Sequence, residues 1–491
     1  MKKTFLGLAV LTLGLSSCKD FLTVVPKTER TTANFYNTAA DFNTALVGAY
    51  STFKHAGLYG SGAGSLIWLG EVSTDNTDYG FPRTGSSVNQ FQIEDLTYQV
   101  GNDLFRDAWL GHYQGISRTN AVLDRLPAVS FDDALKSQYE GEARFLRAMF
   151  YFNLVRLFGP VQLSTTEIND PFAGNTLGRA PVNEVYTLIE NDLIVAENIL
   201  PTTITAANAG RASKWAAKAL LGKVYLTQKK YGLAADKLKE IIDANVNSLM
   251  PNYADVFLST TTFANNREVM LAAQYKGGQI SQGGGFYTQW TPFSALSPDF
   301  GFTNGAGDGV NRPTPNLIAA YPAGDVRKTV SIALSYTSTT GTTVNEPYPT
   351  KFLQKGIIRG ESDVEFPILR YADVLLMYAE AVNEQSGPNA AALDAVNRII
   401  RRSRNLPVNT PNATVDLAAS TSTATLRTRL ELERRLELAF ESQRWFDLVR
   451  TDRFVDVMKA QGKAAQPFHV LYPIPQRETT LNPNLGQNTG Y

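Results

Sequence analysis

Apolar residues recur with helical spacing in several stretches of the chain, most clearly in residues 366–404. In the first part of this stretch the apolar positions share one helical face: Val374, Leu375, Tyr378, Ala379 and Val382. Gly387-Pro388 then interrupts the pattern, and Asn389 is a residue type that caps helix N-termini. We therefore predict two helices joined by a short turn, the unit from which helical-repeat proteins are stacked.

A similar unit is predicted for residues 212–245. Its Leu221, Gly222, Tyr225 and Ala234 follow the spacing of the tetratricopeptide pattern, whereas the later positions of that pattern are not matched. Small residues 12 positions apart, Gly222 and Ala234 here and Ala379 and Ala391 in the later unit, are expected to let paired helices approach closely. We interpret both units as degenerate tetratricopeptide-like pairs.

The remaining periodic segments extend the helical prediction over much of the chain. Helices are expected at about 38–55, 102–126, 132–158, 181–200 and 424–450. The segment 132–158 is apolar nearly all round, so it should be central, with Tyr151 and Phe152 in the core like Tyr225 and Tyr378. In 424–450, Glu431 and Arg435 have the spacing of an i,i+4 ion pair. The predicted fold class is mostly α.

Two long stretches, 57–100 and 277–309, are rich in glycine and polar residues and are predicted to be loops. A weakly alternating segment, 329–350, is expected to form a hairpin around Thr340-Gly341. The two loops carry aromatic residues that no helical or strand period explains: Trp68, Tyr79, Phe81, Tyr287, Trp290 and Phe293. Packing within the loops and contact with a ligand are both open interpretations of these rings.

Aromatic faces in polar loops are typical of sugar-binding sites, because sugar rings stack on them while sugar hydroxyls need polar partners. The loops offer such partners in Asp75, Asn76, Gln289 and Asn304. We therefore predict a ligand site from these ten residues. We expect Trp68 and Trp290 to lie on one exposed face.

The first residues indicate export and a lipid anchor. Residues 1–17 have the pattern of a signal peptide, with Lys2-Lys3 before an apolar run too short to span a bilayer. The run ends in Leu15-Ser16-Ser17-Cys18, which resembles a bacterial lipobox, so Cys18 is the predicted lipidation site; an ordinary secreted protein is the alternative. Cys18 is the chain's single cysteine, which excludes an intrachain disulfide.

Composition and motifs argue against several classes of function. The formal net charge of the 491 residues is zero, which does not favour a nucleic-acid partner. The three histidines lie far apart, and the chain contains no zinc motif, no Gly-x-Ser-x-Gly elbow and no phosphate-binding glycine loop. We therefore predict a protein that is not an enzyme and has neither cofactor nor metal.

A few carboxylates leave alternatives open. Asp75 and Asp78 are candidates for a glycosidase pair, although satisfying loop backbone or hydroxyl groups is the simpler interpretation. Asp299 and Asp308 are candidates for a calcium site without the usual loop spacing. Arg444 and Asp447 are interpreted as structural, pairing with neighbours such as Glu441.

Several motifs are kept in order along nearly the whole chain. They are the lipobox followed by Asp20-Phe21-Leu22, Glu142-Ala-Arg-Phe-Leu-Arg-Ala148 through Phe158-Gly159, Pro315 through Asp325-Val-Arg327, Phe366 through Glu384, Glu433-Arg-Arg-Leu-Glu-Leu-Ala-Phe-Glu441, Arg444-Trp-Phe-Asp-Leu-Val-Arg450, Tyr472-Pro-Ile-Pro475 and Asn482-Pro-Asn-Leu485. Each motif is weakly diagnostic alone, but the set specifically resembles the SusD/RagB family of outer-membrane nutrient-binding lipoproteins from Bacteroidota.

The resemblance implies a SusD-like scaffold of tetratricopeptide-like pairs that supports a loop-rich face. It implies an N-terminal region at 18–276 and a C-terminal region with ligand loops at 277–491. The implied function is capture of oligosaccharides at the cell surface and their delivery to a TonB-dependent, SusC-like transporter in the outer membrane. Two alternatives stay open: a binder of peptides or other nutrients on the same scaffold, and a helical glycoside hydrolase.

Overall fold

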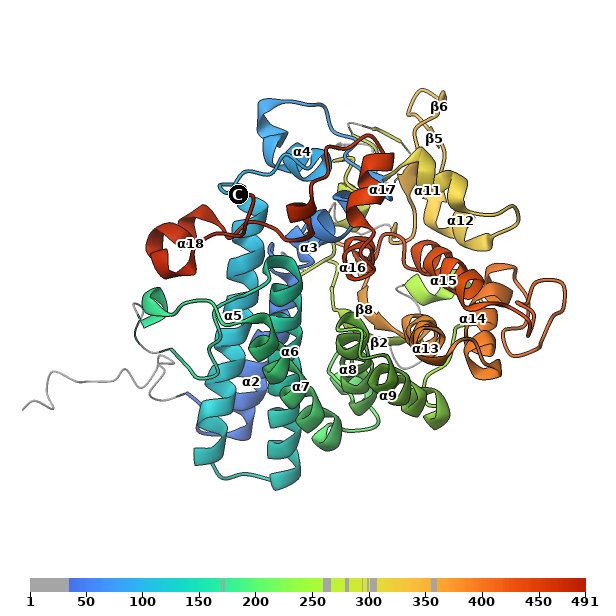
Figure 1. Cartoon of the computed structure of the whole chain (residues 1–491). Coiled ribbons are helices and arrows are strands. Elements are labelled where there is room, and N and C mark those ends of the chain that lie inside the picture. The colour runs from blue at the N-terminus through green and yellow to red at the C-terminus, as the bar shows by residue number, and fades with distance from the viewer. Residues whose placement is uncertain are drawn as a thin grey trace, which may run out of the picture.

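A computed structural model describes residues 35–168, 170, 173–258, 266–278, 282–293, 295–297, 300, 307–354 and 360–491. The described part is mostly helical, which confirms the predicted fold class (Figure 1). Residues 1–17, Cys18 and Asn304 lie outside it, so the leader, the lipidation site and one predicted ligand residue have no structural description here.

A layer of long helices forms the N-terminal side of the molecule (Figure 1). It consists of α2 (Ala39–Tyr50), α5 (Asp103–Arg125), α6 (Asp133–Phe158) and α7 (Val182–Ile199). Helix α6 packs against α2, α5 and α7, and its second half is buried almost continuously. This confirms that the segment with apolar residues on every side is central, because a helix can be apolar all round only where neighbours cover each face.

The two predicted helical pairs are confirmed. One pair is α8 (Lys214–Thr227) with α9 (Tyr231–Ala244), and the other is α13 (Tyr371–Ser386) with α14 (Ala390–Ser403). Helix α7 packs on α8, and α9 packs on α13, so the helices α5, α6, α7, α8, α9, α13 and α14 form one continuous array. Each pair thereby buries the apolar face that it cannot cover alone.

Close contact within the pairs depends on small residues, although not on every one predicted. A Cβ on Gly222 would lie 2.6 Å from a Leu238 methyl group of α9, so only glycine fits there. In the later pair Ala391 is exposed, contrary to expectation, and Ala392 and Ala395 are buried in its place. The side chain of Asn389 caps α14 as predicted, accepting the N–H of Ala392 at 2.9 Å.

The expected single helix at 424–450 is wrong: the structure has α15 (Thr423–Glu437) and α16 (Arg444–Arg450) with a turn between them. Phe440 and Ser442 in this turn have φ angles of 68° and 58°. The turn is held from outside, because the carboxylate of Glu71 accepts the N–H groups of Phe440 at 3.1 Å and Ser442 at 3.0 Å. These bonds compensate for the helical bonds that the break removes.

The expected pair of Glu431 with Arg435 is also wrong. Glu431 contacts Arg453 instead, whereas Arg435 reaches the carboxylate of Asp75 at 3.0 Å. Both side chains of α15 therefore bind residues of other segments. These contacts fix the position of α15 in the fold and do not stabilise the helix locally.

Residues 57–100 and 277–309 contain more regular structure than predicted. Short elements interrupt the described parts of both: α3 (Ser65–Ile67), a π-helical turn at Trp68–Val72, α4 (Val88–Asp95) and α10 (Phe286–Gln289). Further short helices are α11 (Pro315–Ala320), α12 (Val326–Ser331), α17 (Phe454–Ala460) and α18 (Gln476–Leu481). Single 3₁₀ turns lie at Ser51–Lys54, Gly60–Gly62, Gly85–Ser87, Leu126–Ala128, Ala173–Thr176, Ala206–Asn208, Tyr253–Phe257, Pro467–Val470 and Pro483–Leu485.

Within the described ranges, the strands form four antiparallel pairs. They are β1 (Thr77–Asp78) with β3 (Arg312–Pro313), β2 (Val269–Ala273) with β8 (Phe366–Arg370), β4 (Ile332–Ala333) with β7 (Tyr348–Pro349), and β5 (Tyr336–Thr337) with β6 (Thr343–Val344). The pair β5–β6 turns at Gly341, where φ is +80°, which confirms the predicted hairpin. Strand β8 leads directly into α13, and both β2 and β8 contact α8.

The C-terminal segment packs back against the N-terminal layer. The hydroxyl of Tyr472 donates to the carbonyl of Leu69 at 2.7 Å, and its backbone N–H donates to the carbonyl of Leu157 at 2.8 Å. The side-chain amide of Asn488 donates to the carbonyl of Phe158 at 3.0 Å. Segments separated by more than 300 residues in sequence therefore share one core.

A network of buried charges lies where β8, α14 and α15 meet. Glu437 accepts from Arg402 at 2.6 Å and from Arg370 at 3.1 Å, and Glu268 accepts from the same two guanidinium groups at 2.5 and 2.6 Å. Arg370 also donates to Glu441 at 2.7 Å. All of these side chains are almost fully buried. Removing one member leaves an opposite charge uncompensated in the interior, which is strongly destabilising.

We expect Glu437→Gln to lower the free energy of unfolding by about 3–5 kcal/mol, because two buried guanidinium groups lose a charged partner. Burial alone would raise the pKa of Glu437, but the charges of Arg402, Arg370 and Arg327 lower it from 4.5 to about 2. A folded-state pKa below the unfolded one contributes stability above about pH 4.5 that is lost as pH falls toward 2. Thermal melts between neutral and acid pH should therefore show a weaker acid dependence in the variant.

Glu140→Gln is the matched control, because Glu140 forms a half-exposed pair with Arg144 on the surface of α6. We expect this control to change the free energy of unfolding by less than about 1 kcal/mol. Equal melting temperatures for the two variants would contradict the central role of Glu437.

Candidate functional site

Four of the aromatic side chains predicted to bind ligand form one continuous set of ring contacts, which we call the aromatic run. Trp68 meets the edge of Tyr79 with ring centroids 4.9 Å apart. Tyr79 stacks on Phe81 at 5.3 Å with an interplanar angle of 12°, and Phe81 contacts Phe293 at 4.2 Å. The run therefore joins the two stretches that the sequence identified as separate aromatic-rich loops.

Backbone contacts between these stretches explain the meeting. The N–H of Gly80 donates to the carbonyl of Gly309 at 2.7 Å, next to the pairing of β1 with β3. A Cβ on Gly309, where φ is +66°, would lie 3.0 Å from the backbone of Gly80. Glycine thus allows the two backbones to approach and brings Phe81 beside the strand-like bridge between Phe293 and Gly307.

Exposure increases along the aromatic run. Trp68 and Tyr79 are buried, with exposed fractions of 3% and 8%, whereas Phe81 and Phe293 are half-buried. Burial, together with the nearby carboxylate of Asp308, raises the pKa of Tyr79 to about 12, so its hydroxyl stays protonated. A ligand in solution can therefore contact the outer end of the run, formed by Phe81 and Phe293.

Charged side chains lie on the segments next to the run. The guanidinium of Arg83 lies 4.2 Å from the centroid of the Phe91 ring, and it pairs with Glu94 at 3.1 Å. Asp78 accepts from Arg312 at 2.7 and 3.2 Å across the β1–β3 pair. Neither Arg83 nor Arg312 was predicted from the sequence as a site residue. Asp78 and Arg312 are 234 residues apart, so no local pattern identifies their pairing.

The prediction that Trp68 and Trp290 lie on one exposed face is wrong. Trp290 is 1% exposed and contacts the rings of Phe286 and Phe352. Each indole N–H donates to a backbone carbonyl: Trp290 to Gly62 at 2.7 Å, and Trp68 to Ala63 at 3.0 Å. Because the polar atom of each indole is satisfied by the protein, both rings can fill the core between the loops.

Asp75 and Asn76 lie in a buried polar network rather than at a ligand surface. Asp75 accepts two hydrogen bonds from Arg444, at 2.8 and 2.9 Å. Asn76 donates to Glu71 at 2.8 Å and accepts from Arg435 at 2.8 Å. The expectation that Asp75 satisfies loop backbone or hydroxyl groups is corrected: arginines of α15 and α16 hold it.

The structural interpretation of Arg444 and Asp447 is confirmed, although with other partners than Glu441. Arg444 pairs with Asp75, and Asp447 pairs with Arg434 at 3.1 Å and with Arg450 at 2.9 Å. These pairs connect α15 and α16 to each other and to the loop that follows the π-helical turn.

The remaining predicted residues are dispersed. Tyr287 is buried in a separate small cluster with Phe300 and Tyr348, so its predicted contact with ligand is not supported by exposure. Gln289 is half-buried at the end of α10, and Asn304 lies outside the described residues. The centre of the candidate site is therefore formed by Phe81 and Phe293. The buried rings of Tyr79 and Trp68 continue the aromatic run behind them.

Asp75 lacks the character of a glycosidase acid, and the candidate calcium pair is not brought together among the described residues. A glycosidase acid requires a raised pKa, whereas Arg444 and Arg435 outweigh burial and lower the pKa of Asp75. Within the described ranges, no three His, Cys, Asp or Glu side chains are placed to hold a metal, and Asp299 of the possible calcium pair lies outside them. No helix of the described part has the length and apolar character needed to cross a bilayer.

Comparison with known proteins gives matches along the whole chain. Residues 324–491 match the family model described as the SusD family, and residues 20–226 match the model described as starch-binding associating with outer membrane. The sequence is 28% identical to SusD-like protein P2 of Formosa agariphila over 517 aligned residues, which cover 100% of both chains.

Solved structures give the same result. The fold matches a SusD homolog from Bacteroides thetaiotaomicron with a TM-score of 0.81 and 25% identity, covering 94% of this chain and 99% of that one. It also matches a laminarin-binding SusD-like protein with a TM-score of 0.77 and 27% identity, covering 93% and 100% of the two chains.

We expect Trp290→Ala to lower the free energy of unfolding by about 3–5 kcal/mol, because it removes a fully buried aromatic side chain. Trp68→Ala should be similarly destabilising. Trp215→Ala is the matched control, since Trp215 is half-buried on α8 and should cost less. Chemical denaturation of the three variants measures the difference. A variant of Trp290 as stable as the wild type would show that this ring is not part of the core.

Proposed function

The chain belongs to the SusD/RagB family, and from this premise we propose that it is a non-enzymatic binding protein that captures oligosaccharides at the outer membrane. Two observations on relatives support the choice of ligand: one matching family model is described as starch-binding, and one matching structure is of a laminarin-binding protein. Both concern carbohydrates, which favours a glycan over a peptide as the ligand of this chain.

The aromatic run is the observation in this molecule that carries the proposal. Its outer rings, Phe81 and Phe293, are supported from behind by the buried Tyr79 and Trp68, so they are held rigidly while partly open to solvent. Rigid aromatic faces bind sugar rings with little loss of conformational entropy, because the apolar face of the sugar stacks on a surface that is already ordered.

The charged residues beside the run supply the polar half of such a site. Arg83 carries N–H donors and is more than half exposed, and the pair of Asp78 with Arg312 offers both donors and acceptors. Sugar hydroxyls need both kinds of partner. The low pKa of Asp75, held by Arg444, argues against the glycosidase alternative, because this carboxyl cannot act as an acid near neutral pH.

Capture at the outer membrane requires an anchor and a route for the ligand. We infer that Cys18 in the lipobox carries the anchor, and that a TonB-dependent, SusC-like transporter takes the ligand across the membrane. The family resemblance is what points to a transporter of this class.

We expect Phe81→Ala and Phe293→Ala each to weaken glycan binding by about tenfold. Stacking one sugar face removes roughly 50 Å² of apolar surface, about 1 kcal/mol at ~25 cal/mol per Å². Ring geometry adds about 0.5–1.5 kcal/mol. A glycan array with the purified protein identifies the ligand, and calorimetric titration then gives the dissociation constants.

Phe131→Ala is the matched control, because Phe131 is a half-buried ring in the separate cluster beneath α2, with Phe42 5.7 Å away. Its dissociation constant should equal that of the wild type. Unchanged binding by both Phe81 and Phe293 variants would exclude the aromatic run as the site. Binding of peptides but of no glycan would favour the alternative ligand class.

We expect Cys18→Ala to move the protein from the detergent phase to the aqueous phase in phase partitioning, since no other anchor is predicted. The wild-type protein, solubilised from native membranes in mild detergent, should copurify with a large barrel protein of the transporter class. A detergent-phase Cys18→Ala variant would refute the lipid anchor, and repeated absence of a barrel protein would refute the partner.

A further inference from the structure

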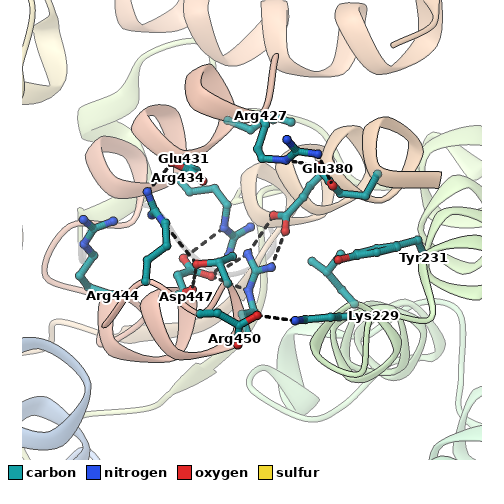
Figure 2. Close-up of a pocket in the computed structure, with 15 residues that line it drawn as sticks. Lys229, Tyr231, Glu380, Arg427, Glu431, Arg434, Arg444, Asp447 and Arg450 are labelled. Atoms are coloured by element: carbon teal, nitrogen blue, oxygen red, sulfur yellow. Dashed lines mark hydrogen bonds and ion pairs between the residues drawn. The ribbon is translucent and has the colours of Figure 1, made fainter. Parts of the chain in front are cut away.

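A cavity of about 210 Å³ lies among the helical pairs and shares no lining residue with the aromatic run (Figure 2). Its walls come from the turn between α8 and α9, from α13 and α15, and from α16 with the turn that follows it. None of the residues predicted from the sequence to bind ligand lines it. A ligand of this cavity would therefore be bound by residues other than those of the candidate site.

Ion pairs line the floor of this cavity. Figure 2 shows Arg450 between Glu380 and Asp447. The bond from Arg450 to Asp447 is 2.9 Å, and Arg434 donates to the same carboxylate at 3.1 Å. Cations and anions in the walls nearly balance. An ionic ligand would have to displace one partner of an existing pair, so the floor disfavours a ligand of either charge.

Nearer the mouth, several polar atoms remain available to a ligand. Arg427 uses Nε and Nη2 to bind Glu384 at 2.8 and 2.7 Å, and Arg453 uses Nε and Nη1 for its contacts with Thr451 and Glu431. Among the described residues, Nη1 of Arg427 and Nη2 of Arg453 donate to no acceptor. The cavity therefore offers guanidinium donors whose charge is already neutralised.

Tyr231 completes this lining. Figure 2 shows its hydroxyl pointing toward the side of Glu380 and Arg450. Within the described part of the chain this hydroxyl makes no hydrogen bond to the protein, although the ring is half-buried. With Leu226 and Leu430 the ring also gives the cavity an apolar surface. The cavity thus combines a hydroxyl donor and acceptor with an apolar patch.

A ligand for this cavity must satisfy three conditions: it is neutral, it both donates and accepts several hydrogen bonds, and it presents some apolar surface. Drug-sized ligands occupy roughly 300–1,000 Å³, so this cavity suits a smaller molecule. Paired carboxylates keep free lone pairs and paired guanidinium groups keep free N–H bonds, so hydroxyl groups can bind both without breaking a pair.

We propose that the cavity between α8–α9, α13, α15 and α16 binds a neutral polyhydroxylated molecule the size of a single sugar ring. Tyr231 contributes its hydroxyl and ring face, and Arg427 and Arg453 contribute their remaining N–H groups. This site is independent of the aromatic run, so the proposal does not require that the aromatic run binds glycans.

The probes are D-glucose, D-galactose and D-mannose, each titrated into the purified wild-type protein and followed by saturation-transfer NMR. We expect at least one to bind with a dissociation constant in the millimolar range. Tyr231→Phe should weaken that binding about fivefold, because it removes one hydrogen bond and keeps the ring. Tyr225→Phe is the matched control, since Tyr225 lies on α8 of the same pair outside the cavity, and it should bind as the wild type does.

Two further measurements separate this site from its alternatives. Phe81→Ala should leave monosaccharide binding unchanged, and about 1 M salt, where the screening length is ~3 Å, should change it little. Absence of binding by all three sugars would overturn the proposal. So would binding that Phe81→Ala abolishes while Tyr231→Phe retains it, or salt-sensitive binding of glucuronate with no binding of the neutral sugars.

Discussion

The buried charges around Glu437 are the constraint on which the arrangement of this molecule depends. Arg370 ends β8 and begins the first turn of α13, Arg402 belongs to α14, and Glu437 ends α15. Because a charge left in the interior without its partner is costly, a shift of any of these elements that separates a pair is unfavourable. The same network extends to the loops, since Lys351 donates to the carbonyls of Glu437 and Ala439 at 3.0 Å. The loop-rich face is thereby fixed to the helical array.

Local periodicity explains what the sequence predicts correctly about the fold. The helical pairs are visible because each buries one stripe of apolar residues, and close approach needs a residue such as Gly222. The break between α15 and α16 is not visible. The residue that holds this break is Glu71, which lies 369 residues away from Phe440. The local sequence of the segment predicts a continuous helix. Long-range hydrogen bonds of this kind override local propensity, and no window of neighbouring residues contains them.

The candidate site shows the same limit. Composition identified the correct loops and four of the rings that meet in the aromatic run. It could not rank their exposure, because Trp290 is buried against Phe286 and Phe352 and donates its indole N–H to Gly62, which lies 228 residues earlier. Asp75 was predicted to bind ligand because it lies near aromatic residues in the sequence. In the structure it is bound instead by Arg444, which lies 369 residues later. The family resemblance, which draws on motifs along the whole chain, predicted the scaffold where single residues could not predict the site.

The packing of the segment from Tyr472 to Asn488 against Leu69, Leu157 and Phe158 has a consequence for how the chain matures. Until that segment has been synthesised, the core around the π-helical turn lacks its last wall, and early-made helices remain without their final contacts. Contacts of such high sequence separation form slowly. The early-made helices can therefore complete this core only after the C-terminal segment has been synthesised.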